Sequence, residues 1–311
     1  MLAVFMGTPR FAVPTLEALA HRGHQIALVV TQPDRPAGRG QKLTASAIKT
    51  KAIELGLPVY QPEKVRAPEA LERLRQIAPE IIVVAGYGQI IPQTIIDLPR
   101  FGIVNVHSSL LPRYRGAAPI NWVIANGETT TGVTTMCIEK RLDAGDMLLR
   151  LETAIGPGET APELAERLAP MGAELLIGTL DGLAAGTITP EKQNEAEATY
   201  APILKREDGL IDWQRPAQEI FNRIRGFDPW PGAYTGFRGK RLHVRRARPL
   251  TGMSLTPGRI STTDGFRAGC GGGTALQFEE LQIEGKQRVA AEDFVRGYRP
   301  ADGEVLGEVR T

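Results

Sequence analysis

Three polar side chains have types and spacings that suit a reaction at a carbonyl carbon. Asn105 and His107 are two residues apart in the segment F-G-I-V-N-V-H, and Asp143 lies in the segment R-L-D-A-G-D-M. Attack of an amine on a carbonyl group builds negative charge on the oxygen and requires a proton to leave the nitrogen. An amide donates to that oxygen, an imidazole titrates near neutral pH, and a carboxylate sets the charge and orientation of the imidazole. We therefore treat the three residues as one candidate catalytic trio.

The segment from Ile103 to His107 is predicted to be a strand, because it is rich in branched apolar residues and is followed by a loop signal. Side chains alternate between the faces of a strand, so Asn105 and His107 point to the same side. They lie toward the carboxyl end, where open parallel sheets form their ligand crevices. Taken alone, the N-V-H pattern also fits a core strand with a buried histidine, and Asp143 also fits a solvated turn.

The elements around this strand predict an α/β fold. Residues 2–6 are predicted to be a buried strand, residues 14–21 a helix and residues 25–31 a second strand, which together begin a β-α-β unit. The run I-I-V-V-A within residues 80–85 lacks alternation, as expected of a parallel strand covered on both faces. We expect a Rossmann-like domain with a parallel sheet over residues 1–188, without the G-x-G-x-x-G turn of dinucleotide-binding proteins. Helices are also predicted over residues 45–55, 68–77, 118–126 and 160–185, the last of them interrupted or kinked at Pro170. A further strand is predicted over residues 132–139.

Two short loops are candidates for ligand contact. Gly86, Tyr87 and Gly88 end the strand predicted over residues 80–85 in a turn that could lie over a flat ligand. Glycines that only turn the chain would produce the same pattern. Ser109, Leu110, Leu111 and Pro112 form a compact loop directly after the strand that carries His107.

The loop at residues 31–43, T-Q-P-D-R-P-A-G-R-G-Q-K-L, is predicted to lack regular structure because it contains two prolines and two glycines. Arg35, Arg39 and Lys42 stand in it against one acid, Asp34. Such a loop is either a solvated surface segment or an arm that grips a phosphate-bearing partner. Its charge alone does not decide between the two.

The last third of the chain is predicted to form a second domain. Residues 189–207 are polar and weakly patterned, which indicates a linker, and residues 208–311 follow with a helix over 216–225 and short strands between glycine and proline signals. That pattern is typical of a small β-barrel of the OB-like kind.

A basic run lies inside this second domain. Residues 238–248 contain six basic side chains and no acid: Arg238, Lys240, Arg241, Arg245, Arg246 and Arg248. Alternating positions such as Arg241, His243 and Arg245 would share one strand face and could follow an RNA backbone. Such contacts would position an RNA rather than read its sequence. The alternative is a solvated strand face.

Composition limits the class of protein. With 311 residues, of which 42% are hydrophobic and 23% charged, the chain is long enough for two globular domains. Cys137 and Cys270 are far apart and lack metal-ligand spacing, so we expect no disulfide and no metal site. We expect no apolar run to reach the length of a membrane span, and Met1 leads almost directly into a predicted strand. We therefore expect a cytoplasmic protein without a membrane segment.

The long segments N-V-H-S-S-L-L-P-R-Y-R-G-A-A-P-I and R-L-D-A-G-D-M together resemble the folate-dependent formyltransferases. With the amino-terminal G-T-P-R-F and the basic loop at residues 31–43, the chain is similar throughout to those members of the family that formylate methionyl-tRNA. The resemblance implies that 10-formyltetrahydrofolate is the co-substrate and that initiator methionyl-tRNA is the partner. It also implies that the loop around Arg39 inserts at the acceptor end of the tRNA.

The same resemblance implies roles for the candidate residues. Asn105 would polarise the formyl oxygen, while His107, supported by Asp143, would handle protons as the methionyl amine attacks. The loop from Ser109 to Pro112 would help to bind the folate. We expect a monomer, because no exposed apolar stripe is evident in the sequence.

Two other functions stay open at this point. A formyltransferase acting on an amino sugar nucleotide would share the N-x-H and S-L-L-P patterns but would have less use for the basic loop at residues 31–43. An RNA-binding adaptor with a retired active site would keep the basic segments and would have no need of the trio.

Overall fold

The computed structural model describes residues 1–37, 42–253 and 255–307 and forms two compact units. The N-terminal unit consists of residues 1–119, 130–154 and 164–202, and the C-terminal unit consists of residues 120–129, 155–163 and 203–311. Both units are therefore discontinuous in sequence. The single domain boundaries predicted after residues 188 and 207 stay a prediction, and by packing residues 189–202 belong with the N-terminal unit.

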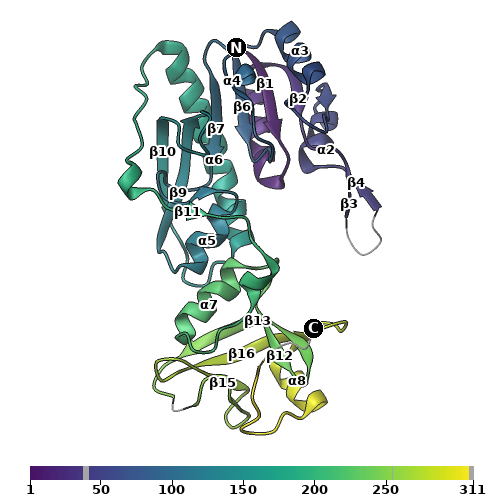
Figure 1. Ribbon diagram of the computed structural model, residues 1–311, viewed down its shortest axis with the longest axis vertical. Coiled ribbons are helices and arrows are strands. Elements are labelled where there is room, and N and C mark those ends of the chain that lie inside the picture. The colour runs from purple at the N-terminus through teal and green to yellow at the C-terminus, as the bar shows by residue number, and fades with distance from the viewer. Residues whose placement is uncertain (38–41, 254, 308–311) are drawn as a thin grey trace. The chain divides into compact units, whose positions relative to one another are not determined.

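A seven-stranded sheet runs through the N-terminal unit in the order β10-β9-β7-β6-β1-β2-β5 (Figure 1). Neighbours from β7 to β5 are parallel, whereas β9 is antiparallel to both β7 and β10. The predicted Rossmann-like α/β class is confirmed, with one antiparallel strand inside a mostly parallel sheet. The strands are β1 (Leu2–Gly7), β2 (Gln25–Val30), β5 (Val59–Tyr60), β6 (Ile81–Ala85), β7 (Ile103–His107), β9 (Thr130–Cys137) and β10 (Met147–Ala154).

Helices cover both faces of this sheet, and successive strand residues enter different cores. In β6, Val83 packs in the cluster that contains residues of α1, α2 and α6, whereas Val84 packs in the cluster that contains residues of α3 and α4. This double cover explains why the strand sequence does not alternate. The helices and short turns of helix of the N-terminal unit are η1 (Arg10–Ala12), α1 (Val13–His21), α2 (Ala47–Glu54), α3 (Pro68–Ile77), α4 (Gln93–Ile96), α6 (Ala161–Ala185) and η2 (Glu195–Glu197). Helix α5 (Pro119–Ala125) belongs almost entirely to the C-terminal unit.

Helix α6 occupies nearly the predicted residues but is more regular than its sequence suggested. Pro170 lies inside it without interrupting it. By length and composition α6 could cross a membrane, and it is the one helix of the described residues that passes this test, so the expectation that no apolar run reaches that length is wrong. Leu176 and Leu180 are fully buried in the same cluster as Val83 and Val104. They pack as the residues of a core helix do.

Part of the basic loop is regular, contrary to prediction. β3 (Arg35–Ala37) and β4 (Lys42–Thr44) pair as an antiparallel ribbon at the margin of the N-terminal unit (Figure 1). Pro36 is tolerated because a two-stranded ribbon has free edges, where a missing N–H removes no ladder bond. Arg39 lies outside the described residues. A second small sheet pairs β8 (Arg115–Gly116) in parallel with β11 (Tyr200–Ala201).

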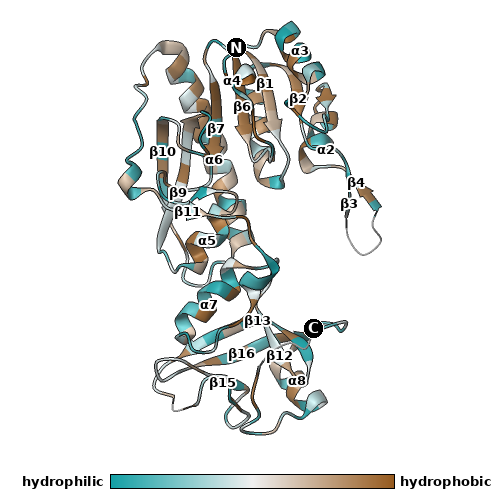
Figure 2. Cartoon of the chain, viewed as in Figure 1, coloured by the Kyte–Doolittle hydropathy of each residue, from teal (hydrophilic) through white to brown (hydrophobic). Residues whose placement is uncertain are grey.

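The C-terminal unit is an antiparallel half-barrel packed against helices, which confirms the predicted small β domain. Its sheet has the order β12-β13-β16-β15-β14, with β17 added to β16. Apolar side chains of α7 and α8 enter its core, and Figure 2 shows both polar and apolar residues on α7. The elements are η3 (Arg206–Gly209), α7 (Ala217–Gly226), β12 (Tyr234–Phe237), β13 (Lys240–Leu250), β14 (Ile260–Ser261), β15 (Arg267–Cys270), β16 (Thr274–Ile283), β17 (Val289–Ala290) and α8 (Ala291–Tyr298).

Candidate active site

The structure brings the predicted trio together on one face of the N-terminal sheet. Val104 and Val106 enter the core on the opposite face, so Asn105 and His107 share the other face of β7, and both are largely buried. The Nδ1 atom of His107 lies 3.8 Å from Oδ2 of Asp143. Three polar groups from two separate segments of the chain therefore meet at the carboxyl end of a parallel strand, where such sheets bind ligands.

The contacts of His107 indicate which nitrogen carries its proton. Nε2 lies 3.0 Å from the carbonyl oxygen of Tyr114, and a carbonyl can only accept, so Nε2 is the protonated atom of the neutral ring. Nδ1 then faces Asp143 with a lone pair, which accounts for a separation beyond hydrogen-bond length. A proton taken up at Nδ1 would convert this approach into an ion pair. His107 can thus accept a proton on the side where a carboxylate stabilises it.

Asp143 is held in an unusual conformation. Its φ is +46°, a left-handed value that is uncommon for residues other than glycine, although Asp adopts it more readily than most. Its Oδ2 atom accepts a 2.8 Å hydrogen bond from the backbone N–H of Gly116. Two residues later the chain passes so close to β9 that a Cβ on Gly145 would lie 1.9 Å from the carbonyl oxygen of Cys137. The turn therefore requires glycine at position 145.

The environment of Asn105 leaves its side-chain amide available to a ligand. Its side chain is largely buried and makes no hydrogen bond to the residues that the structure describes. Met136 of β9 lies opposite it in register and packs with Leu111 and Met147. An amide without a protein partner, in a largely buried residue beside an apolar cluster, is suited to donate to the oxygen of a bound carbonyl group.

Hydrogen bonds within the loop from Ser109 to Pro112 and to Thr134 of β9 fix its conformation. Ser109 Oγ donates to the carbonyl of Arg113 at 2.6 Å, and Thr134 Oγ1 donates to the carbonyl of Ser109 at 2.7 Å. The backbone N–H of Leu111 donates to Thr134 Oγ1 at 3.2 Å, and the Leu111–Pro112 peptide bond is cis. Leu110 is the only half-buried member, since the other three are buried. A ligand would therefore meet the Leu110 side chain and the backbone of a rigid loop.

The second predicted loop lies at the same sheet edge, because β6 is the parallel neighbour of β7. Gly86 and Gly88 have φ values of +58° and +82°. The carbonyl of Tyr87 accepts hydrogen bonds from Thr8 Oγ1 at 3.0 Å and Gln32 Nε2 at 3.1 Å. The Tyr87 ring is buried in the sheet core, and burial raises the pKa of its hydroxyl. Its ring is therefore not placed to stack on a ligand, and any contact falls to the backbone.

The predicted basic residues differ in exposure and in whether their side chains already have partners in the protein. In the β3–β4 ribbon, Arg35 pairs with Glu63 at 2.8 Å on the surface, and Lys42 is exposed. Arg39, between them in sequence, is outside the described residues. Both described side chains are accessible, because the Arg35 pair is itself exposed and costs little to exchange.

On β13 the basic residues form an outward stripe, since Leu242 and Val244 point into the core. Arg241 lies over the Tyr234 ring, 4.7 Å from its centroid, and Arg245 donates to Gln282 Oε1 at 2.8 and 3.0 Å. Arg246 is exposed. The three were predicted as equivalent, but two of them already have partners within the C-terminal unit.

The environment of His243, which lies between Arg241 and Arg245, disfavours the protonated form of its imidazole. Burial, and then the nearby Arg245 and Arg241, lower its pKa to about 4. The imidazole is therefore neutral at physiological pH and adds no positive charge to the stripe.

A set of residues that hold the site was not predictable from the sequence. Gln193 donates to the carbonyls of Asp143 and Gly145, both at 2.8 Å, and the fully buried Arg115 donates to Gln193 at 2.9 Å. Arg115 also pairs with Glu195. Arg115 is in the segment that carries the family resemblance but was given no role there, and Gln193 is in the stretch predicted to be a linker. No pattern in the sequence marked either one.

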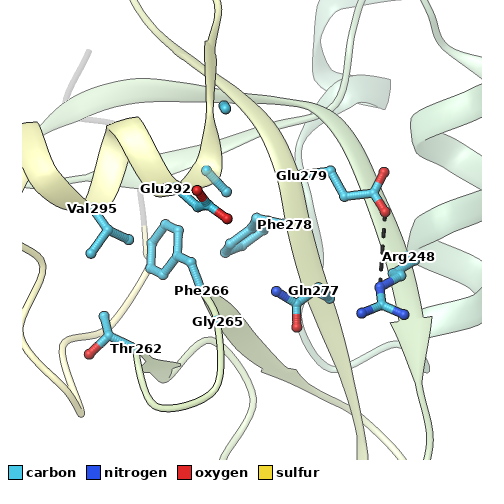
Figure 3. Close-up of a pocket in the computed structure, with 11 residues that line it drawn as sticks. Arg248, Thr262, Gly265, Phe266, Gln277, Phe278, Glu279, Glu292 and Val295 are labelled. Carbon is cyan, nitrogen blue, oxygen red and sulfur yellow. Dashed lines mark ion pairs between the residues drawn. The ribbon is translucent and has the colours of Figure 1, made fainter.

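A cavity of about 710 Å³ lies elsewhere, in the C-terminal unit, and is lined mainly by residues of β16, of α8 and of the segment 262–266 that precedes β15 (Figure 3). Its rim carries Arg248 and Glu279, whose charged groups are 4.0 Å apart. The rings of Phe266 and Phe278 line it but are almost fully buried. None of the residues predicted for catalysis or folate binding lines this cavity. Among the described residues, no group of His, Cys, Asp and Glu side chains is placed to hold a metal ion.

Comparison with known proteins places the chain in a class. Residues 1–180 match the family model of formyl transferases, and residues 203–299 match the model of the formyl transferase C-terminal domain. The chain therefore belongs to the formyl transferase family. A solved structure of this fold, the N-formyltransferase from Helicobacter canadensis in complex with folinic acid and dTDP-3-aminofucose, superposes with a TM-score of 0.69 at 19% identity, covering 91% of this chain and 100% of that one.

Much closer relatives carry a more specific name. The methionyl-tRNA formyltransferase of Solibacter usitatus is 57% identical over 309 residues, which cover 99% of each chain. The methionyl-tRNA formyltransferase of Koribacter versatilis is 55% identical over 311 residues, again covering 99% of each chain. The similarity spans both units, including the C-terminal half-barrel.

Proposed function

We propose that this protein is an enzyme that transfers the formyl group of 10-formyltetrahydrofolate to the free amino group of initiator methionyl-tRNA, for translation initiation. The meeting of Asn105, His107 and Asp143 on one sheet face is the observation that carries the proposal. The identity of 57% over nearly the full length of a methionyl-tRNA formyltransferase supports the choice of acceptor. The Helicobacter canadensis enzyme supports the fold alone, because its identity is 19%.

Each residue of the trio has a separate role in the reaction. When bound, the folate supplies the formyl carbon. Asn105 donates from its amide to the formyl oxygen as negative charge develops there. His107 takes the proton of the attacking amine at Nδ1, and the carboxylate of Asp143 stabilises the imidazolium that results. The imidazolium then returns the proton to the folate nitrogen whose bond to the formyl carbon breaks, so that tetrahydrofolate leaves and His107 is neutral again. The carbonyl of Tyr114 holds the opposite side of the ring, so the accepting nitrogen points in one direction.

The folate is held by the loops at the carboxyl edge of β6 and β7. Ser109, Leu110, Leu111 and Pro112 form one wall, and the backbone of Gly86, Tyr87 and Gly88 forms another. The fit is supported by the unpaired amide of Asn105 beside the apolar cluster of Leu111, Met136 and Met147, which suits a neutral formyl group with little water around it.

The tRNA is held by basic residues of both units. Arg35, Arg39 and Lys42 contact the acceptor end, and Arg241, Arg245 and Arg246 contact the backbone elsewhere. Support comes from the exposure of Lys42 and Arg246 and from the outward face of β13. The arginines with internal partners, Arg241 and Arg245, contribute less than Arg246, because they exchange existing contacts for new ones.

The enzyme acts as a monomer in the cytoplasm, with domains at residues 1–188 and 208–311 and a linker at 189–207. Large exposed apolar side chains such as Leu43, Ile90 and Trp230 are scattered over separate elements, which supports a monomer. Cys137 and Cys270 are both free thiols, which supports a reducing compartment. Sedimentation of the purified protein tests the monomer directly.

The experiment that tests the function offers two acceptors in parallel. Purified protein is incubated with 10-formyltetrahydrofolate and either initiator methionyl-tRNA or an amino sugar nucleotide, and His107→Ala serves as the inactive control. Formylated methionyl-tRNA alone is the expected result. Product on the sugar alone would keep the trio and overturn the acceptor. Binding of tRNA without product on either acceptor would favour the RNA-binding adaptor.

A further inference from the structure

A segment of the N-terminal unit, which we name the 191–201 strap and which includes η2 and β11, contacts the chain beside the Asp143 turn and the loop that follows β7. At its beginning Glu191 and Met147 exchange two backbone hydrogen bonds of 2.8 Å. Near its end the carbonyl of Thr199 accepts from the N–H of Arg115 at 2.9 Å, and β11 then pairs with β8. The strap therefore joins the turn that carries Asp143 to the loop that carries the carbonyl contacting His107.

One side chain of the strap points inward between these attachments. Gln193 is buried, although its neighbours on both sides are exposed. Its Nε2 atom donates to the carbonyls of Asp143 and Gly145, both at 2.8 Å, and its Oε1 atom accepts from Arg115 Nε at 2.9 Å. Both amide hydrogens are used, and both go to the backbone of the Asp143 turn. A buried amide with all of its donors engaged permits little movement of its partners.

The orientation of Gln193 is itself fixed by a charged pair. The guanidinium of Arg115, only 1% exposed, makes two parallel hydrogen bonds of 3.0 and 3.1 Å to the carboxylate of Glu195. This pairing raises the pKa of Arg115 and lowers the pKa of Glu195, so both groups stay charged across the physiological range. The planar fork leaves the Nε atom of Arg115 pointing at Gln193.

Asp143 is consequently held at two points. Gln193 binds its backbone carbonyl, and the N–H of Gly116 binds its carboxylate. Both holding groups connect to Arg115, the first through a hydrogen bond and the second as its neighbour in the chain. These two contacts fix both the backbone and the carboxylate of Asp143, whose φ of +46° places the residue in the left-handed region.

We infer that Gln193 is a positioning residue for the formyl transfer reaction: it fixes the backbone of residues 143–145 so that the Asp143 carboxylate faces Nδ1 of His107. The inference rests on the proposed function, since it concerns the same trio. It gives a role in the chemistry to a segment that its sequence marks only as a linker. Arg115 and Glu195 act behind Gln193 by orienting it.

The test replaces Gln193 with a side chain of similar length that cannot donate, Gln193→Met, and compares it with Lys192→Met at the exposed neighbouring position. Gln193→Met should lower kcat about tenfold or more while KM for both substrates stays within about threefold, because turnover and not binding depends on the carboxylate position. Lys192→Met should behave as the unchanged protein. Gln193→Glu, which keeps the acceptor facing Arg115 and loses both donors, is measured in parallel in case Gln193→Met does not fold.

A double-mutant cycle with Asp143→Asn separates positioning from general stability. If Gln193 acts through the Asp143 carboxylate, adding either Gln193 substitution to Asp143→Asn should change kcat by less than about twofold. Losses that multiply in the double variant would overturn the inference, because Gln193 would then act independently of Asp143.

A second readout does not depend on turnover. Hydrogen exchange of the Gly116 amide, which is protected by the Asp143 carboxylate, should be faster in the Gln193 variants and unchanged in Lys192→Met. Unaltered exchange in the Gln193 variants would refute the positioning role even if the enzyme used another acceptor. Failure of the unsubstituted protein to formylate methionyl-tRNA would instead refute the proposed function and leave the exchange result to decide the role of Gln193.

Discussion

Replacing Asp143 by asparagine is the sharpest test of how the trio works, because the change removes a charge and little else. The amide keeps an oxygen that can accept from the N–H of Gly116, so the turn has no reason to unfold. What is lost is the attraction between the carboxylate and a protonated His107, whose facing atoms are 3.8 Å apart. The protein should therefore fold and bind both substrates while its turnover falls.

The size of the fall follows from that distance. Two unit charges 3.8 Å apart interact by about 4 kcal/mol at an effective dielectric constant of about 20, which corresponds to about a thousandfold in rate. The side chains of His107 and Asp143 are 6% and 16% exposed, so solvent reduces this only in part. The dipole of the substituted amide recovers some of the remainder. We expect kcat for Asp143→Asn to fall by about a hundredfold to a thousandfold.

The assay is single-turnover formyl transfer to methionyl-tRNA with the folate in excess, so that the chemical step is observed rather than product release. Asp146→Asn is the matched control, since it makes the same chemical change three residues away on a side chain without a contact to His107. A loss of less than about threefold for Asp143→Asn would refute charge stabilisation of His107. Equal losses in both variants would show that the turn tolerates no amide at all.

Three further predictions follow from single features of the structure. Gly145→Ala would place a Cβ 1.9 Å from the carbonyl of Cys137, so it should displace the turn and lower kcat at least as strongly as Asp143→Asn; activity near that of the unsubstituted protein would contradict the packing. Arg246→Ala should reduce the slope of log K for tRNA against log salt by about one, whereas Arg296→Ala on α8 should not, and equal slopes in all three proteins would place the stripe away from the RNA. The pKa of His243 is about 4 in the folded protein, so the unfolded chain takes up its proton first as the pH falls below about 6.5, and stability should drop between there and pH 4. Because the ring is only half-buried, we expect the free energy of unfolding to fall by about 1–2 kcal/mol over this pH range. This fall should be absent in His243→Gln. An equal fall in that variant would rule out His243 as its source.

Elements with strong local patterns were predictable, and β7 shows why. The branched residues of Ile103–His107 and the loop signal behind them define the strand to the residue, and the two-residue period then puts Asn105 and His107 on one face. The strand β10 was missed, because the charged residues Arg150 and Glu152 occur at its half-exposed edge and hide its pattern. Local sequence reveals a strand best where both faces are buried.

The supporting residues could not be predicted, because they depend on contacts between distant segments. Arg115 and Gln193 are 78 residues apart and both look like surface residues in sequence. Tyr87 shows the reverse case: its place between two glycines suggested a ligand platform, but the ring packs in the sheet core. Burial of a polar or aromatic side chain is decided by tertiary packing, which a single sequence does not display.

The discontinuity of the two units has a consequence for how the chain folds as it is made. Residues 120–129 leave the ribosome early, but their partners in the C-terminal unit come about a hundred residues later: Trp122 packs edge-on to Phe227 at 5.3 Å, and Asn121 Nδ2 donates to the carbonyl of Gly226 at 2.8 Å. The apolar face of α5 therefore stays unpacked while β9, β10 and α6 are synthesised. Interruption of synthesis within that interval would leave Trp122 without the Phe227 ring that packs against it.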